Sequence, residues 1–409
     1  MFNSGLDVDT LSRKTVPDAR FRGFVPSLIA VREKRYTHKE NPDMQLRGRK
    51  HVAAVGGAVL VTLLAAACSS STTNPPASGA TGGGSSPTSG SENLSGTLNA
   101  SGSTFQTNFQ QSAISQFKSV QSGMTVNYGG GGSGKGRTDL AGGTVNFAGS
   151  DSPIPSKDEP LFKGKKVLYF PVQIGPIAVA YNLSGVSNLK LDPKVLADIF
   201  SGKVTTWNDQ EIKALNSGAN LPGTKITLAV RSDSSGTTQN FSLFLQTAAG
   251  SAWTLGSSST IKWPSTAHAA SGGSGVAQVV KTTSGAIGYV DDSTAKASGL
   301  STAMIKNKDG AFVAPSSAGA TAAASAVTPK PDLTFTTVWQ GGATAYPITY
   351  QSWDLVFAQQ PNANDAAMLK AYIGYLLGQG QSLLEPIGLA PLPSNIDSMA
   401  KAQLDQITS

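Results

Sequence analysis

From about residue 94 to the C-terminus, strand-like and helix-like patterns alternate along the chain, and this alternation constrains the fold more than any other feature. Four β-branched or apolar runs predict strands: KKVLYFPV, GPIAVAYNL, KITLAVR and GAIGYV. Helical spacing predicts helices at residues 103–117, 194–200, 237–245 and 366–384, and we expect the Ala/Ser-rich stretch 310–332 to contain a surface loop. Such alternation is typical of α/β folds in which helices flank mixed sheets, and the length suffices for two lobes.

The N-terminal segment predicts targeting rather than a fold. RGRKH precedes an uncharged run at residues 52–67, too short to span a membrane, and Cys68 follows it directly. Residues 44–68 therefore predict a signal peptide that starts at Met44, with residues 1–43 an upstream extension outside the real protein. AAAC resembles a bacterial lipobox, which implies lipidation of Cys68, although Leu64 lies four residues before the cysteine instead of the preferred three. A free cysteine after an ordinary signal cut is the alternative.

Composition separates this N-terminal part from the body. Residues 69–93 are almost entirely Ser, Thr, Gly, Pro and Ala, which predicts a flexible tether. The formal charge is +7, but residues 1–67 hold 11 Lys/Arg against 6 Asp/Glu, which leaves 21 against 19 for the rest. A nearly neutral body gives no electrostatic argument for nucleic acid. We expect an extracytoplasmic body that is lipid-anchored to the outer face of the cytoplasmic membrane.

Groups suited to catalysis are scarce in the body. His268 is the only histidine after Cys68, and no further cysteine follows, so a zinc site of the His/Cys type is excluded. A Ser-His-Asp hydrolase would depend on His268 alone, in the loop-like sequence STAHAASGG. The inventory favours binding over enzymatic turnover and predicts neither a cofactor nor a metal.

A glycine-rich stretch at residues 128–139, YGGGGSGKGRTD, raises the question of a nucleotide. Its glycines and Lys135 match the GxxxxGK spacing of a P-loop, but Gly136 stands where a P-loop needs a hydroxyl for magnesium. We therefore expect the glycines to let the backbone and Ser133 approach a different anion. A plain flexible loop is the alternative.

A second turn suited to an anion surrounds Arg231 in AVRSDSSGTTQNF. A helix that directly follows a strand presents unpaired N–H groups and the positive end of its dipole. Arg231 adds a permanently charged fork, and Asp233 could hold that fork in place. The turn also contains hydroxyls and a glycine: Ser234, Ser235, Gly236 and Thr237. An N-capped helix beside a surface arginine is the alternative.

Two more turns complete the set. ASGSTFQTNF places Thr104 and Phe105 at another strand-to-helix turn, for which plain N-capping is the alternative. NFAGSDSPIP places Asp151 after a short strand. An ionised carboxylate only accepts hydrogen bonds, so it favours an oxyanion that carries a hydrogen, as phosphate does at neutral pH and sulfate does not. Asp151 as an N-cap before Pro153 is the alternative.

Together these segments resemble the substrate-binding lipoprotein of the bacterial phosphate ABC transporter. Seven motifs occur in the family's order: GSTF, YGGGGSG, FAGSDSP, VLADIFSGKVTTWND, RSDSSGTT, GAIGYV and IGLAPLP. The resemblance implies a periplasmic-binding-protein-like fold of type II, in which two α/β lobes joined by a hinge close over a dehydrated phosphate. We expect residues 94–172 with 306–409 to form lobe 1 and residues 173–305 to form lobe 2.

The resemblance also assigns residues and partners. It implies phosphate contacts from a set of eight residues, with Asp233 in support: Thr104, Phe105 through its main-chain N–H, Ser133, Asp151, Arg231, Ser235, Gly236 and Thr237. Lys135 departs from the small residue expected there. The implied partners are inorganic phosphate, the permease subunits of an ABC transporter and the membrane through a lipid anchor. A receptor for sulfate or molybdate, a secreted phosphate-ester hydrolase and an adhesive surface protein stay open as alternatives.

Overall fold

The computed structural model describes residues 94–409, so the predicted signal peptide, Cys68 and the tether lie outside the described residues. Within that range a nine-stranded sheet follows the order β2-β1-β3-β12-β4-β8-β6-β7, with β9 beside β4, and a small sheet follows the order β11-β10-β5. The strands are β1 (Gly96–Gly102), β2 (Met124–Gly129), β3 (Phe147–Ser150), β4 (Val167–Tyr181), β5 (Lys190–Leu191), β6 (Thr227–Arg231), β7 (His268–Ala270), β8 (Ala286–Asp291), β9 (Ser301–Thr302), β10 (Met304–Lys306), β11 (Phe312–Val313) and β12 (Thr349–Phe357).

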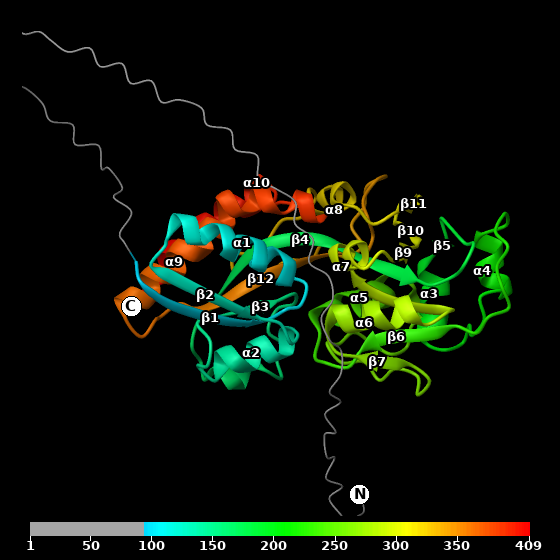
Figure 1. Cartoon of the computed structure of the whole chain (residues 1–409), viewed down its shortest axis with the longest axis horizontal. Helices are drawn as coiled ribbons and strands as arrows, with labels where there is room; N and C mark the ends of the chain where they lie inside the picture. Colours follow the sequence, from blue (N-terminus) through cyan, green and yellow to red (C-terminus); the bar gives the residue numbers. More distant parts are fainter. Residues whose placement is uncertain (1–93) are drawn as a thin grey trace, which may run out of the picture. The chain divides into compact units, whose positions relative to one another are not determined.

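The fifteen-residue strand β4 is shared by two halves of the large sheet. It pairs antiparallel with β12 as far as Pro176, and from Ile177 onward it pairs antiparallel with β8. One lobe is built on β1, β2, β3 and β12, and the other on β6, β7 and β8 (Figure 1). The predicted two-lobed α/β fold with mixed sheets is therefore confirmed. The predicted lobe boundaries remain a prediction, and the first of them falls inside β4.

The prediction of two separate strands for KKVLYFPV and GPIAVAYNL was wrong, because both belong to β4. The predicted gap between them, Gln173 and Ile174, is part of the strand. Proline cannot donate to a strand ladder, so Pro171 needs a special position within it. In the structure Pro171 lies where the pairing register between β4 and β12 shifts, next to Ser352 and Trp353. A bulge of this kind tolerates proline without ending the strand.

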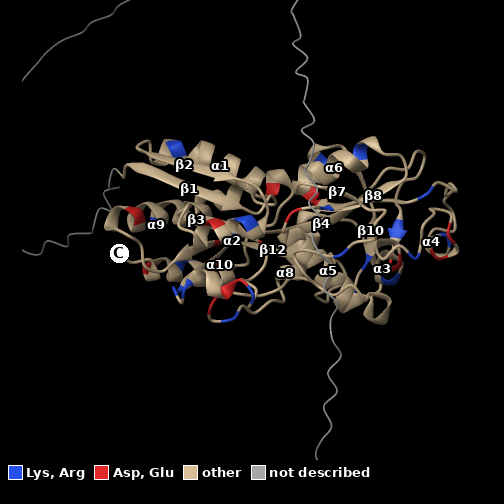
Figure 2. Cartoon of the chain, turned by 90° about the horizontal axis from the view of Figure 1, so that it is seen from below, with Lys and Arg blue, Asp and Glu red and all other residues tan. Residues whose placement is uncertain are grey.

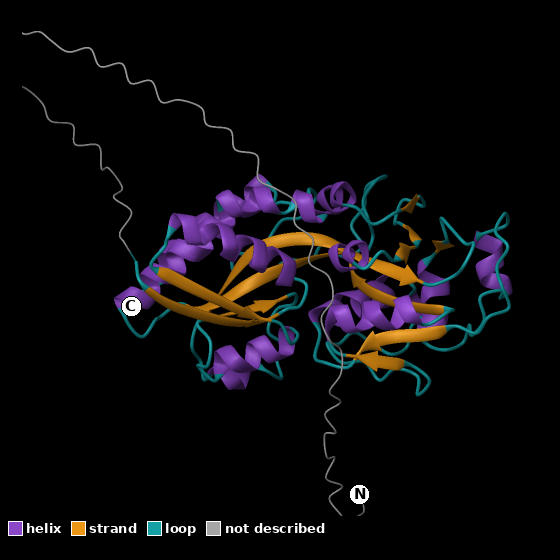
Figure 3. Cartoon of the chain, viewed as in Figure 1, coloured by secondary structure: helices purple, strands orange, loops and turns teal. Residues whose placement is uncertain are grey.

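Helices cover both faces of the sheet in the first lobe. Figure 3 shows them around the strands, and in Figure 1 α1, α9 and α10 lie on one face with α2 on the other. Their bounds are α1 (Thr107–Val120), α2 (Ser133–Ala141), α8 (Ser317–Ala324), α9 (Ala363–Leu377) and α10 (Ser394–Gln403). The core between α1 and α9 contains an edge-to-face contact of Phe117 and Tyr372, whose ring centroids are 5.1 Å apart.

The second lobe has its own helical cover and its own aromatic core. Its helices are α3 (Pro193–Phe200), α4 (Gln210–Leu215), α5 (Gly236–Ala248), α6 (Gly272–Thr282) and α7 (Asp292–Ala297). Phe241 of α5 stacks on Tyr289 of β8, with ring centroids 4.5 Å apart. Trp207, from the VLADIFSGKVTTWND motif, is fully buried and donates to Gly285 O at 2.9 Å. This motif is therefore a packing element of the lobe.

Two predicted elements differ from the structure. The helix predicted to run to residue 384 ends at Leu377, because Gly378 and Gly380 interrupt it and a short 3₁₀ turn follows. The stretch expected to contain a surface loop also contains a helix that was not predicted, α8, which packs against β4 and buries Ala320. The 3₁₀ turns of the described chain are Glu159–Phe162, Gly250–Ala252, Gln379–Leu383, Glu385–Ile387 and Leu404–Gln406.

Basic and acidic residues are interspersed over both lobes (Figure 2), in keeping with the nearly neutral composition of the body. Among the residues that the structure describes, no helix is both long enough and apolar enough to cross a bilayer.

Candidate anion-binding site

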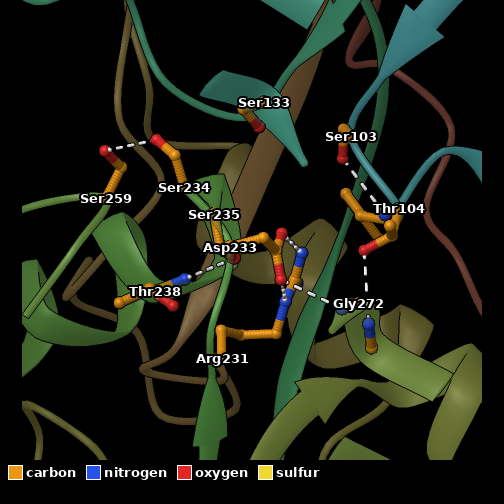
Figure 4. Close-up of polar contacts among 12 residues, drawn as sticks. Ser103, Thr104, Ser133, Arg231, Asp233, Ser234, Ser235, Thr238, Ser259 and Gly272 are labelled. Atoms are coloured by element: carbon orange, nitrogen blue, oxygen red, sulfur yellow. Dashed lines mark hydrogen bonds and ion pairs between the residues drawn. The ribbon is translucent and has the colours of Figure 1, made fainter. Parts of the chain in front are cut away.

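The four turns singled out in the sequence meet where the two lobes face each other. Figure 4 shows Ser133 and Thr104 on one side and Arg231, Asp233 and Ser235 on the other. Each turn follows the carboxyl end of a strand: β1, β2, β3 or β6. The lobes touch here, because the Gly134 N–H at the start of α2 donates to Ser234 O at 2.9 Å.

Arg231 ends β6 and is held tightly by Asp233. Its Nε donates to Asp233 Oδ1 at 2.8 Å, its Nη2 donates to Oδ2, and its side chain is only 2% exposed. Burial alone would lower the pKa of Arg231, but the bond to Asp233 raises that pKa above its usual value. Asp233 also accepts from the Gly272 N–H at 3.0 Å. The interpretation of Arg231 as a surface arginine is therefore wrong.

Asp151 follows β3 and is 1% exposed. Its Oδ1 accepts from Ser352 Oγ at 2.6 Å, and its Oδ2 accepts from Ser133 Oγ at 3.3 Å. Burial raises the pKa of Asp151 to about 6, against the opposing effects of hydrogen bonds from Ser103, Ser352 and Ser133 and of the Arg231 charge. No helix begins at the two residues after Asp151, so the N-cap interpretation is wrong. Asp151 and Arg231 thus face one site, close enough for each charge to influence the other.

The start of α5 closes the site from the second lobe. Ser235 caps the helix by accepting the Thr238 N–H at 3.1 Å, which leaves its own hydroxyl hydrogen for another acceptor. The first N–H groups of α5, from Gly236 onward, have no partner within the helix. A Cβ on Gly236 would overlap Ser133 Oγ and lie 2.6 Å from Asp151 Cβ. Only glycine fits here while the lobes are in contact.

The GSTF turn lies on the first-lobe side of the site. Helix α1 begins at Thr107, so Thr104 and Phe105 lie in a turn before the helix instead of in its predicted first turn. The Phe105 ring is buried and stacks on Tyr350 with centroids 4.0 Å apart, while its N–H donates to Ser103 Oγ at 3.1 Å. Thr104 Oγ1 accepts from an N–H at the start of α6 at 3.4 Å. The ring of Phe105 therefore belongs to the core, and the predicted phosphate contact of its main-chain N–H stays a prediction.

The two basic residues of the glycine-rich stretch are engaged elsewhere. Lys135 is 53% exposed and forms an ion pair with Asp139 one helical turn away. Arg137 lies on the buried face of α2, and its Nε donates to Asp158 Oδ2 at 3.0 Å. Lys135 therefore does not point into the site, and the P-loop spacing is coincidental.

Several residues that help to build the site were not predicted. Asn240 Nδ2 donates to Asp151 O at 2.7 Å, and Ser352 contacts the Asp151 carboxylate. Tyr289 OH accepts the Arg231 N–H at 3.3 Å and lies 2.7 Å from Thr238 Oγ1. The start of α6 adds further N–H groups. Only the polar pair in the strand sequence TYQSW could have signalled such a role in advance. In the described range, no group of three or more His, Cys, Asp or Glu side chains is arranged to hold a metal ion.

Two lobes that share a strand, with helix starts, hydroxyls, one arginine and one carboxylate gathered between them, define a substrate-binding protein of the periplasmic-binding-protein class. The model of the PBP superfamily domain matches residues 87–379, and the chain belongs to this superfamily. More narrowly, it belongs to the PstS family of phosphate-binding proteins. Phosphate-binding protein PstS 3 of Mycobacterium leprae is 35% identical over 326 residues, which cover 76% of this chain and 88% of the relative.

Other comparisons agree with this placement. Phosphate-binding protein PstS 2 of Mycobacterium tuberculosis is 35% identical over 337 residues, covering 78% of this chain and 90% of the relative. A high affinity periplasmic phosphate-binding protein bound with phosphate superposes with a TM-score of 0.64 at 21% identity, covering 75% of this chain and 94% of that chain. A phosphate-binding protein from Stenotrophomonas maltophilia superposes with a TM-score of 0.63 at 18% identity, covering 75% and 93%. The family resemblance predicted from the motifs is confirmed.

Proposed function

We propose that this protein binds inorganic phosphate between its lobes and delivers it to the permease subunits of an ABC transporter for import. The observation that carries the proposal is that Arg231 and Asp151 are both buried and close enough for the arginine charge to act on the carboxylate. The arginine and the helix starts attract an anion, whereas the carboxylate accepts a hydrogen that the anion must bring. Phosphate meets both conditions at neutral pH.

The site supports recognition without turnover. The eight proposed contacts supply hydroxyls, N–H groups and one guanidinium, which can together replace the hydration of a buried anion: Thr104, Phe105, Ser133, Asp151, Arg231, Ser235, Gly236 and Thr237. A site that hydrogen-bonds a ligand hydrogen rejects analogues without it by roughly 10⁴–10⁵. This selectivity disfavours the alternative of a sulfate or molybdate receptor.

The N-terminal segment indicates where the protein is located. The basic stretch, apolar run and Cys68 are the features of an exported lipoprotein, so we propose a receptor held by a lipid on the outer face of the cytoplasmic membrane. Cells grown with labelled palmitate test this part. The label should appear in the protein and should be lost in the Cys68→Ala variant, and equal labelling of both would contradict lipidation.

Calorimetry and tryptophan fluorescence test the central proposal. Titration of the purified protein with phosphate should give saturable binding with one site, and sulfate at the same concentrations should give none. If sulfate or molybdate bound more tightly than phosphate, that anion would be the ligand and the proposal would be wrong. Release of product from a chromogenic phosphate ester would favour the hydrolase alternative.

A further inference from the structure

A network of hydrogen-bonded, buried side chains connects the core of the first lobe with the carboxylate of Asp151. Ser352 Oγ donates to Asp151 Oδ1 at 2.6 Å, and Gln106 Nε2 donates to Ser352 Oγ at 2.8 Å. Behind Gln106, Gln110 Nε2 donates to Gln106 Oε1 at 3.0 Å and to the Asp354 carboxylate at 3.3 Å. Each of these five side chains is at most 1% exposed, so the hydrogen-bond network is shielded from bulk solvent.

The donors and acceptors of this hydrogen-bond network can be assigned in only one consistent way. Gln106 Oε1 acts as an acceptor because Gln110 donates to it, and the amide nitrogen of Gln106 must therefore face Ser352. A serine hydroxyl has a single hydrogen. Since Ser352 Oγ already accepts from Gln106, its hydrogen goes to Asp151 Oδ1 rather than to Ser150 O, which is farther away at 3.4 Å.

This direction suits an ionised Asp151. Donors stabilise the charged form of a carboxylate, whereas a protonated carboxyl group would itself need an acceptor. If Ser352 became that acceptor, its own hydrogen would have only the more distant Ser150 carbonyl to bond. The fixed donor therefore keeps Oδ1 occupied. Oδ2 accepts from Ser133 Oγ at 3.3 Å and lies toward Gly236 at the start of α5, so it is the oxygen on the side of the anion site.

We propose that Ser352, oriented by Gln106, is a specificity-determining positioning residue: it fixes the Asp151 carboxylate as a hydrogen-bond acceptor and thereby sets the preference for a tetrahedral anion that carries a hydrogen. This inference rests on the proposed function and deepens it. Because Ser352 acts through Asp151, its removal changes selectivity more than it changes affinity for phosphate.

The test compares phosphate and sulfate binding by calorimetry at pH 8 in wild type, Ser352→Ala and Ser352→Thr. In Ser352→Ala the ratio of sulfate Kd to phosphate Kd should fall by about tenfold to hundredfold, the range for loss of one hydrogen bond to a charged group. Phosphate binding itself should persist. Ser352→Thr retains the hydroxyl and should restore most of the selectivity.

The matched control is Thr349→Val, which removes another buried hydroxyl from β12. Thr349 Oγ1 donates to Tyr346 O at 2.8 Å and does not contact Asp151, so its loss should leave the ratio unchanged. The inference is overturned if the ratio of sulfate Kd to phosphate Kd is unchanged in Ser352→Ala, or if it falls equally in Thr349→Val. Neither outcome would contradict phosphate binding by the wild-type protein. If Ser352→Ala does not fold, the same ratio is measured in Gln106→Met, in which it should also fall. Failure of wild type to bind phosphate overturns the proposed function as well.

Discussion

Arg231 Nε lies 2.8 Å from Asp233 Oδ1, and Nη2 donates to the other oxygen of the same carboxylate. One whole edge of the guanidinium is therefore occupied by a residue only two positions along the chain. The opposite edge, with the Nη1 donors and the outer hydrogen of Nη2, is the part of Arg231 that we propose contacts phosphate. Asp233 thus holds the guanidinium in one orientation through two charge-assisted hydrogen bonds.

Arg231→Ala should abolish tight phosphate binding. Removal of one partner from a buried, hydrogen-bonded charge pair costs about 2–5 kcal/mol, which corresponds to a Kd increase of roughly 30-fold to several thousand-fold. Calorimetry measures the change. Lys135→Ala is the matched control, because Lys135 is paired with Asp139 at the surface and its loss should leave the Kd within about twofold. An unchanged affinity in Arg231→Ala would remove Arg231 from the site.

Asp151→Asn should relax the discrimination against sulfate. The amide replaces a pure acceptor with a group that can also donate, so a sulfate oxygen no longer faces a bare negative charge. We expect sulfate binding to become measurable in competition with phosphate, while circular dichroism reports an unchanged fold. If the variant still ignores sulfate completely, the role of Asp151 as hydrogen acceptor is wrong.

Sulfate binding by wild type should depend on pH through Asp151. Burial raises the pKa of Asp151 to about 6. The protonated fraction of Asp151 therefore grows about tenfold from pH 8 to pH 7 and is about one half near pH 6. Sulfate affinity should follow this fraction, rising as the pH falls and levelling off below pH 6. In Asp151→Asn the same titration should be flat. A flat profile in wild type would contradict the prediction.

Gly236→Ala should impair phosphate binding although it adds only one methyl group. The new carbon would overlap Ser133 Oγ and approach Asp151 Cβ to 2.6 Å, so the two lobes could not meet at the site. Gly218→Ala is the control, because a Cβ at Gly218 would meet no atom within 4 Å. A large loss of affinity is expected only in the first variant, and equal affinities would show that the lobes need not approach so closely.

Asp354→Asn should raise the melting temperature at pH 8. Burial raises the pKa of Asp354 to about 7, opposed by hydrogen bonds from Gln110 and Gln106. A carboxyl whose folded pKa is raised binds its proton more tightly in the folded state, so stability is lost as the pH rises from about 4 through 7. The variant should therefore gain stability at pH 8 and change little at pH 4. A lower melting temperature at pH 8 would mean that the ionised carboxylate is better compensated than its burial suggests.

Much of the site could be predicted from the sequence because its parts lie in local turns. Arg231 ends a strand and Asp151 follows one, each beside a short motif of Gly and Ser, and such turns can be recognised without knowing the rest of the fold. The relation between Gln106, Ser352 and Asp151 was not readable in this way. These residues lie up to 246 positions apart and meet only through the pairing of β12 with β3.

The fold shows the same division. Most strands and amphipathic helices followed their local patterns, whereas α8 was not predicted because its Ala- and Ser-rich sequence has no amphipathic stripe. Alanine has high helix propensity, and the small side chains let α8 pack closely on β4. Helix α8 therefore forms because of its tertiary contacts, which the local pattern of polarity does not reveal.

The continuity of β4 across both lobes has a practical consequence for protein engineering. A truncation that aims to produce one lobe alone would cut through a buried strand and leave an unpaired sheet edge, a common cause of aggregation. Split reporters and biosensors based on this scaffold are therefore better made by circular permutation at exposed loops, which keeps this strand intact in a single polypeptide.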